Sequence, residues 1–162
     1  MPVTILRGVS GSGKSTYAKS VPGVVCSADD FFMVRGVYRF DPLRLGEAHA
    51  ACLRKFVSLV TRRTSVVVDN TNIRVLEMAP YVAVALAYGA RVKIVTVICD
   101  PLVAASRNQH GVSGDAVLRQ YSRLMEEEIP PQWLHVEMAT HISGKLPEVN
   151  EMLRWEYRKT YT

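Results

Sequence analysis

A glycine-rich segment near the start of the chain limits what it can fold into. Gly8 to Ser15 reads G-x-x-x-x-G-K-S, and the short β-branched run Val3 to Leu6 precedes it. Glycines let the backbone curl around an anion, and a helix that begins at the end of the curl points its positive end at that anion. The segment therefore predicts a strand, a phosphate-binding loop and a helix, which together open an α/β fold.

The loop predicts a nucleoside triphosphate as its ligand, with ATP and Mg²⁺ the favoured pair. Lys14 is expected to reach the β- and γ-phosphates, and the Ser15 hydroxyl is expected to ligate Mg²⁺. The residues of the loop expected to contact the nucleotide are Gly8, Ser10, Gly11, Ser12, Gly13, Lys14, Ser15 and Thr16. The chain carries no N-K-x-D guanine signature, so the loop does not indicate a GTPase.

Short apolar strands alternate with helices along the rest of the chain. Strands are predicted at residues 24–26, 65–69 and 91–98, and helices at 14–21, 42–59, 75–88, 101–108, 115–128 and 147–158. Three consecutive valines at 66–68 are typical of a strand covered on both faces. The type of segment 133–142 stays open. The pattern predicts a three-layer P-loop NTPase fold of the adenylate-kinase type, with a parallel central sheet and helices on both faces.

The bulk properties agree with one domain over residues 1–162. Three separated cysteines without a C-x-x-C pair favour buried, reduced thiols, and we expect a cytoplasmic protein. No apolar stretch approaches the roughly 20 residues of a membrane span. A net charge of +5 suits a phosphate-rich partner, although proteins that bind only nucleotides are often as basic.

Carboxylates follow two of the predicted strands and are candidates for chemistry. Asp29 and Asp30 come after the second strand, and the carboxyl ends of parallel strands share one edge, so one of them is expected beside the phosphate loop. There it can accept the proton of an attacking hydroxyl. Asp69 ends the third strand, where a carboxylate holds Mg²⁺ directly or through water. Asn70 follows it with a hydrogen-bonding side chain. The competing interpretation is a set of solvated turn residues.

Arg107 is the candidate for neutralising charge during phosphoryl transfer. It follows the short helix predicted at 101–108, inside a helical lid expected over about residues 101–128. Gly111 and Gly114 are placed to hinge that lid. An ordinary surface arginine is the alternative. On the helix over 42–59, His49 shares a side with Cys52 and is expected to be packed or hydrogen bonded rather than catalytic.

In order along the chain, Gly8 to Thr16, Ser27 to Asp30, Val68 to Asn72 and Arg107-Asn108 resemble the motifs of 5′-hydroxyl polynucleotide kinases, best known from bacteriophages. The likeness is closer still to the kinase-like domains of a group of eukaryotic ubiquitin-ligase-binding proteins. The further residues that carry it are Phe31-Phe32, Tyr38, Phe40-Asp41, Glu47-Ala48-His49, Glu77, Pro80-Tyr81 and His110-Gly111-Val112. The resemblance covers about residues 3–128.

The resemblance implies a role for particular residues. Lys14 and Ser15 would hold ATP and Mg²⁺, Asp29 would be the general base on the 5′-hydroxyl, and Arg107 would be the lid arginine on the ATP phosphates. Phage enzymes place an arginine three residues after the base to grip the acceptor, whereas this chain has Phe32. Arg35 or Arg39 in the following loop is the substitute to be tested.

The resemblance implies ATP-dependent phosphorylation of a 5′-hydroxyl DNA or RNA end. No D-x-D-x-T segment marks a phosphatase half, so we expect a stand-alone kinase or one domain of a larger repair protein. The acceptor side is expected to involve Asp29, Asp30, Arg35, Arg39 and Asn70. Near them, Tyr38 between two arginines can stack on a base, or it can simply be a packed loop residue. Two other functions stay open: a kinase for a nucleoside, sugar or metabolite, and a binding module ordered by ATP without catalysis.

Overall fold

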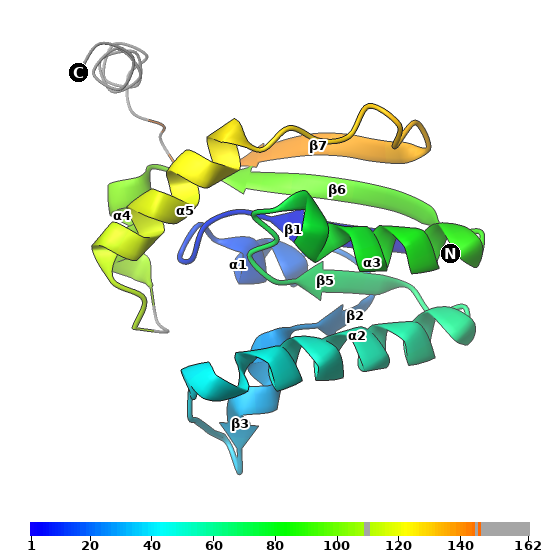
Figure 1. The fold of residues 1–162 in the computed structure, drawn as a ribbon, viewed down its shortest axis with the longest axis horizontal. Helices are drawn as coiled ribbons and strands as arrows, with labels where there is room; N and C mark the ends of the chain where they lie inside the picture. The colour runs from blue at the N-terminus through cyan, green and yellow to red at the C-terminus, as the bar shows by residue number, and fades with distance from the viewer. Residues whose placement is uncertain (109–110, 145, 147–162) are drawn as a thin grey trace.

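A parallel sheet forms the centre of the computed structural model, which describes residues 1–108, 111–144 and 146. Its strands are β1 (Pro2–Arg7), β2 (Val24–Cys26), β5 (Val66–Asp69), β6 (Arg91–Ile98) and β7 (Val136–Ile142). They lie in the order β2-β5-β1-β6-β7, and every neighbouring pair is parallel. The carboxyl ends of the strands therefore meet at one edge, beside the loop that follows β1 (Figure 1).

Helices lie on both faces of the sheet. They are α1 (Lys14–Ala18), α2 (Leu45–Thr61), α3 (Val75–Ala87), α4 (Pro101–Arg107) and α5 (Gly114–Glu126), with short 3-10 turns η1 (Ala28–Phe32) and η2 (Pro42–Arg44). Figure 1 shows α2 and α3 in front of the sheet, α1 behind it, and α4 with α5 at the carboxyl edge. The predicted three-layer P-loop fold is confirmed.

Alternation along the strands divides the core between the two faces. Ile5 and Val68 pack with Phe56 of α2 and Met78 of α3 in the larger cluster. The side chains of alternate strand positions, Leu6, Val67, Val95 and Val97, pack with Ala18 of α1 on the other face. Because both sets of strand side chains are buried, the valine run lacks the polar alternation of a half-exposed strand.

The predicted elements differ from the structure in several places. The helix after the glycine loop ends at Ala18, earlier than predicted. Segment 133–142, whose type the sequence left open, contains β7, an edge strand paired with β6. The buried side of α2 carries Ala48, Cys52, Phe56 and Val60. His49 is exposed, so of the expectation that it is packed or hydrogen bonded, the packed alternative is wrong. The helix predicted at 147–158 lies outside the described residues.

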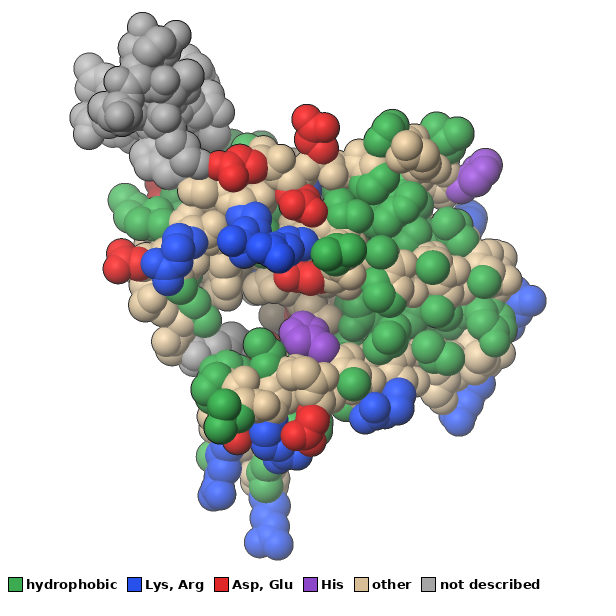
Figure 2. Space-filling model, viewed as in Figure 1, with side chains coloured by type: hydrophobic (Ala, Val, Ile, Leu, Met, Phe, Trp, Pro, Cys, Tyr) green, Lys and Arg blue, Asp and Glu red, His purple; other side chains and the backbone are tan. Residues whose placement is uncertain are grey.

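A two-stranded hairpin that the sequence analysis did not predict follows η1. Its strands, β3 (Met33–Val34) and β4 (Val37–Tyr38), are antiparallel, with Met33 opposite Tyr38. Strands this short show no measurable alternation in a sequence. The hairpin projects beyond the sheet below β2 (Figure 1), and Figure 2 shows basic side chains extending from that end of the molecule.

Cys26, Cys52 and Cys99 are buried and unbridged, as predicted. The helices among the described residues are too short or too polar to cross a bilayer.

Candidate functional site

The glycine loop forms a curled backbone between β1 and α1. Gly11 and Gly13 have φ angles of 78° and 98°, a region that side chains other than glycine rarely adopt. A Cβ added to Gly11 would lie 2.0 Å from the Ala104 carbonyl oxygen of α4, and one added to Gly8 would lie 2.5 Å from the Val97 carbonyl oxygen of β6. The loop therefore packs tightly between α4 and the sheet. Gly8 and Gly11 have no space for a side chain beside these carbonyl oxygens, and Gly11 and Gly13 also have φ angles that favour glycine.

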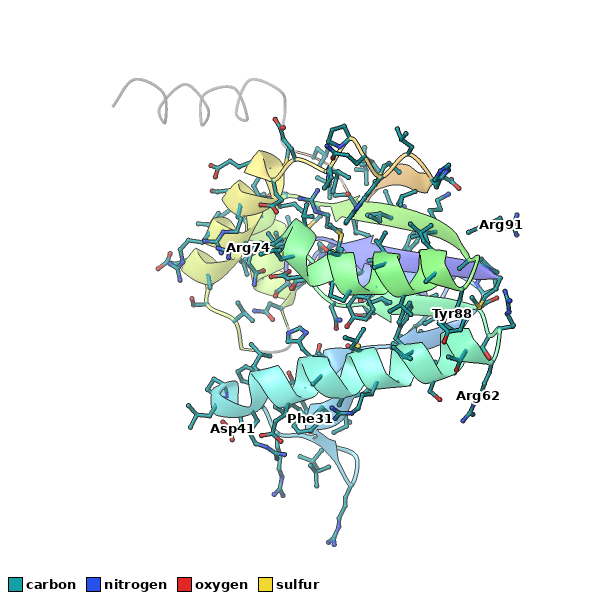
Figure 3. All side chains as sticks on the ribbon, turned by 45° about the vertical axis from the view of Figure 1, so that its right-hand side comes forward. Phe31, Asp41, Arg62, Arg74, Tyr88 and Arg91 are labelled. Atoms are coloured by element: carbon teal, nitrogen blue, oxygen red, sulfur yellow. The ribbon has the colours of Figure 1, made fainter. Side chains whose placement is uncertain are left out.

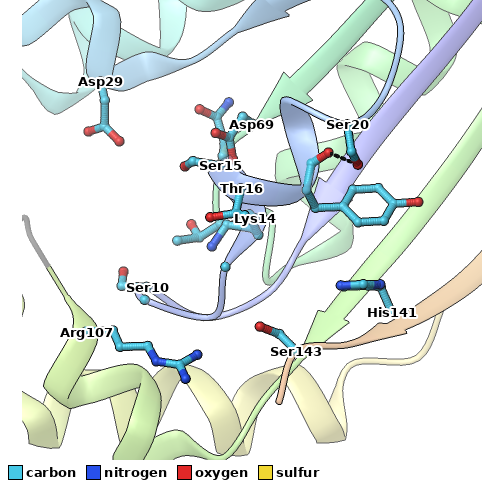
Figure 4. Close-up of a pocket in the computed structure, with 15 residues that line it drawn as sticks. Ser10, Lys14, Ser15, Thr16, Ser20, Asp29, Asp69, Arg107, His141 and Ser143 are labelled. Atoms are coloured by element: carbon cyan, nitrogen blue, oxygen red, sulfur yellow. Dashed lines mark hydrogen bonds between the residues drawn. The ribbon is translucent and has the colours of Figure 1, made fainter.

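A cavity of about 810 Å³ opens over this loop (Figure 4). Ten of the residues predicted for the site line it: Ser10, Gly11, Gly13, Lys14, Ser15, Thr16, Asp29, Asp69, Asn70 and Arg107. Five further residues that the sequence analysis did not select complete the lining: Tyr17, Ser20, Thr71, His141 and Ser143. Gly8 and Ser12 of the loop do not line the cavity. The Gly8 N–H donates to the Thr71 carbonyl at 2.8 Å, and Ser12 is fully buried.

Lys14 projects into the base of the cavity from the first turn of α1. Its ammonium donates to the Val9 carbonyl at 2.7 Å, and its side chain is 8% exposed. Burial lowers the pKa of Lys14 to about 8, against the opposing attraction of Asp69 and Asp29. A bound anion would stabilise the charged form of this lysine, because the negative ligand replaces the solvation that the ammonium has lost on burial.

Ser15 and Asp69 meet on the same side of the cavity. The Ser15 hydroxyl donates to the Asp69 carboxylate, which is 9% exposed at the end of β5. Burial raises the pKa of Asp69, while the Ser15 hydrogen bond and the charge of Lys14 oppose the rise. A hydroxyl and a carboxylate are oxygen ligands of the kind that Mg²⁺ prefers.

Asp29 lies across the cavity from the loop, in η1 (Figure 4). The Ser27 hydroxyl caps this turn by accepting from the Asp29 N–H at 3.2 Å, and the Asn70 side chain accepts from the Ala28 N–H at 2.8 Å. Asn70 is itself buried at the end of β5. It therefore joins the end of one strand to the turn that carries the carboxylate, which gives Asn70 a structural contact beside its place in the cavity wall.

Three other residues were predicted to bind the substrate that accepts the phosphate, and they lie outside the cavity lining: Asp30, Arg35 and Arg39. Asp30 points to α2, where its carboxylate accepts from Lys55 at 2.8 Å. Arg35 forms the turn of the hairpin with a φ of 51°, and both Arg35 and Arg39 are exposed to solvent. Phe32, which stands at the arginine position of the phage enzymes, is 3% exposed and packs in the core.

Helix α4 lines the cavity on the side opposite Asp29 through Arg107, and α5 packs behind the phosphate loop. Arg107, at the end of α4, points toward the loop near Ser10 (Figure 4). The Ser10 N–H donates to the Gln120 side-chain oxygen of α5 at 2.9 Å. Ala104 and Val117 share a buried cluster with Val9, so these helices pack directly on the phosphate loop.

Sequence reasoning missed some contacts because no local pattern signals them. Gln120 reaches Ser10 across 110 positions. The ring of His141 at the end of β7 lies 4.7 Å from the ring of Tyr17 in α1. Tyr38, for which base stacking and packing in the loop both stayed open, donates its hydroxyl to Asp29 at 2.8 Å. Each contact depends on how elements distant in the sequence pack together.

The chain is similar in sequence to known proteins over most of its length. A family model described as an AAA domain matches residues 3–124. NEDD4-binding protein 2 of Homo sapiens is 32% identical over 160 residues, a match that covers 86% of this chain and 9% of that protein. The chain therefore corresponds to a small part of that relative's length.

Several solved structures share the fold. A chain of the Pnkp1/Rnl/Hen1 RNA repair complex has a TM-score of 0.64 and 22% identity, covering 77% of this chain and 44% of that one. A gluconokinase from Sinorhizobium meliloti 1021 has a TM-score of 0.57 and 17% identity, covering 99% and 98% of the two chains. The fold is that of P-loop kinases, and the resemblance predicted from the motifs is confirmed.

Proposed function

We propose that this chain, which belongs to the AAA domain family matched over residues 3–124, is an ATP-dependent kinase for the 5′-hydroxyl of a DNA or RNA end. The observation that carries the proposal is the cavity, which brings Asp29 to the same space as Lys14, Ser15, Asp69 and Arg107. A site that only held a nucleotide would not need a carboxylate facing the phosphate loop from the turn after β2. We propose residues 1–162 as one kinase domain, with residues 101–128 as its lid.

The proposed reaction follows from the placement of the Asp29 carboxylate across the cavity from the phosphate loop. Asp29 accepts the proton of the acceptor hydroxyl, whose oxygen then forms a bond to the γ-phosphorus as the bond to the β-phosphate oxygen breaks. The products are a phosphate ester and ADP. Lys14 and Arg107 neutralise the negative charge that collects on the phosphate oxygens.

The residues at the base of the cavity fit a magnesium nucleotide. Mg²⁺ is usually held by one or two protein side chains together with phosphates and waters. Ser15 and Asp69 are hydrogen bonded to each other there, and among the described residues no cluster of three His, Cys, Asp or Glu side chains offers a protein-only cage. When bound, the ion supplies positive charge to the phosphate oxygens.

The acceptor is proposed to approach over the hairpin, on the Asp29 side of the cavity. Arg35 and Arg39 are exposed on this element, whereas Phe32 is buried and cannot grip a phosphate. Arginine pairs well with phosphate because its planar guanidinium donates two parallel hydrogen bonds. These two arginines therefore support a nucleic-acid end as the acceptor, and likeness to a chain of an RNA repair complex supports it further.

A small-molecule kinase is the second candidate. The absence of an arginine from position 32 favours it, as does the shared fold with a gluconokinase over nearly the whole of both chains. An acceptor screen with radiolabelled ATP separates the two, with a 5′-hydroxyl oligonucleotide tested beside nucleosides and sugars. Labelling of sugars alone would support the second candidate. Failure to label any acceptor would support a non-catalytic binding module.

The assignment of the base is tested by changing the two neighbouring aspartates in turn. Asp29→Ala should still bind ATP but lose phosphoryl transfer by about 10²–10⁴-fold, the usual contribution of a general base. Asp30→Ala is the matched control, because that carboxylate pairs with Lys55 outside the cavity lining, and it should lose much less. Transfer rates and ATP affinities of both variants give the answer. Near-normal turnover by Asp29→Ala would remove Asp29 from this role.

A further inference from the structure

The carboxylate proposed as the base has a protein partner on the hairpin. The phenol of Tyr38 donates to the Oδ1 atom of Asp29 at 2.8 Å, between residues nine positions apart. Tyr38 is half-buried, whereas Asp29 lines the cavity. The hydrogen bond thus reaches from the wall of the site to a residue behind it.

The hairpin turn brings Tyr38 back to this place. Arg35 and Gly36 at the turn have φ angles of 51° and 80°, the pairing typical of a type I′ turn, which suits the twist of a two-stranded hairpin. Val34 lies opposite Val37 and Met33 opposite Tyr38. The Arg39 N–H then donates to the Phe32 carbonyl at 2.9 Å. This register returns β4 beside η1, the turn that carries Asp29.

Aromatic packing holds the ring of Tyr38 in position. Phe32 meets Tyr38 edge to face at 6.1 Å between ring centroids, and meets Phe31 and Phe40 at 5.4 Å and 5.1 Å. Such edge-to-face pairs add to the stability that burial of the rings provides. Phe32 therefore supports the hairpin, which accounts for an apolar residue at the position where the phage enzymes have arginine.

The electrostatic setting keeps Tyr38 a hydrogen-bond donor. Burial raises the pKa of Tyr38 above its ordinary value, and the hydrogen bond to Asp29 and the negative charge of Asp29 raise it further. The phenol stays protonated throughout the neutral range. A fixed donor on Oδ1 restricts rotation of the carboxylate and so selects how it faces the cavity.

We infer that Tyr38 is a positioning residue. It holds the Asp29 carboxylate in the orientation needed to take the proton from the substrate hydroxyl. The inference rests on the proposed function, since it concerns the carboxylate proposed there as the base. The hairpin fixes the position of Tyr38, and Tyr38 acts through Asp29. The element that carries Arg35 and Arg39 therefore also orients the base.

Removal of the hydroxyl alone tests the inference. Tyr38→Phe keeps the ring and its packing, and it should lower kcat by roughly 10- to 100-fold, as a small misplacement of a catalytic group does. The KM for ATP should not change. Tyr88→Phe is the matched control, because Tyr88 lies near Arg62 and Arg91, away from the phosphate-loop edge of the sheet (Figure 3). A Tyr38→Phe enzyme with wild-type kcat would overturn the inference.

A double-mutant cycle separates positioning from support of the fold. If Tyr38 acts through the carboxylate, Tyr38→Phe should cause no further loss of transfer in an Asp29→Asn background. A loss of the same size in both backgrounds would instead mean that the hydroxyl supports the hairpin without orienting the base, and the inference would be wrong.

A spectroscopic measurement at neutral pH tests the pair without any phosphate acceptor. With ¹³C at the Cζ atom of tyrosine, the Tyr38 resonance should shift in Asp29→Asn, because a neutral amide is a weaker hydrogen-bond acceptor than a carboxylate. An unchanged Tyr38 resonance would contradict the contact. If the wild type transfers no phosphate to 5′-hydroxyl ends while this resonance shifts in the variant, the proposed function fails and the Tyr38–Asp29 pairing stands.

Discussion

The ammonium of Lys14 is almost fully buried, with its hydrogen-bond partner in the loop itself, the Val9 carbonyl. Burial lowers its pKa to about 8, although Asp69 and Asp29 oppose the change. A bound triphosphate would favour the charged form of Lys14 and raise that pKa again. At the scale of single residues, then, proton uptake and nucleotide binding are linked through one side chain.

Nucleotide affinity should fall as the pH rises through about 8. The bound state keeps the Lys14 proton and the free state loses it above this pH, so affinity should approach a tenfold loss per pH unit above the pKa. Calorimetric titrations between about pH 7 and pH 9, in buffers of different ionisation enthalpy, measure both the affinity and the protons taken up. Lys14→Met should bind weakly with little pH dependence. Equal wild-type affinities at both ends of the range would contradict the linkage.

At the scale of elements, the phosphate loop is held from several directions. Helix α4 presses on it through the Ala104 carbonyl, and α5 binds the Ser10 N–H through Gln120. The buried guanidinium of Arg7 at the end of β1 donates to the carbonyls of Ile73, Leu124 and Glu127, which ties the end of α5 to the sheet. The proposed lid is therefore anchored at both the loop and its own carboxyl end.

Three glycine substitutions measure how rigid the contact between α4 and the loop is. Gly46→Ala in α2 has open space and should stabilise the protein by up to about 1 kcal/mol, whereas Gly36→Ala adds only φ strain, about 1–2 kcal/mol. Gly11→Ala adds φ strain and overlap with Ala104, and it should lose about 2–4 kcal/mol. Urea denaturation gives the three values. If Gly11→Ala lowers the free energy of unfolding no more than Gly36→Ala does, α4 must move to accommodate the added methyl group.

At the scale of the whole molecule, one edge of the sheet gathers the site. The parallel strands β1, β2 and β5 end together there, so the phosphate loop, the Asp29 turn and Asp69 converge although they are far apart in the sequence. A ligand in this cavity contacts several elements at once and stabilises all of them against unfolding.

ATP with Mg²⁺ should therefore raise the melting temperature. A concentration 100 times the Kd adds about 2.7 kcal/mol, which corresponds to roughly 5–10 °C for a domain of this size. Chelation of Mg²⁺ should reduce the increase, and Asp69→Asn should reduce the response to Mg²⁺ more than the response to ATP alone. Thermal denaturation with and without chelator measures both. An Asp69→Asn protein with the full Mg²⁺ response would remove Asp69 from the metal site.

The sequence by itself determined the phosphate loop, the parallel α/β class and the residues at the strand ends, because these depend on local patterns. A glycine spacing, a run of valines or a carboxylate after an apolar strand can each be read within a short window. Ten of the predicted residues line the cavity for this reason.

Only the tertiary structure decided which of the neighbouring polar residues face that cavity. Asp29 and Asp30 are adjacent in sequence, but the turn of η1 directs one to the cavity and the other to Lys55. The hairpin that brings Tyr38 to Asp29 and the α5 packing that brings Gln120 to Ser10 are likewise products of assembly. The orientation of a side chain depends on neighbours far along the chain, and a local pattern does not contain them.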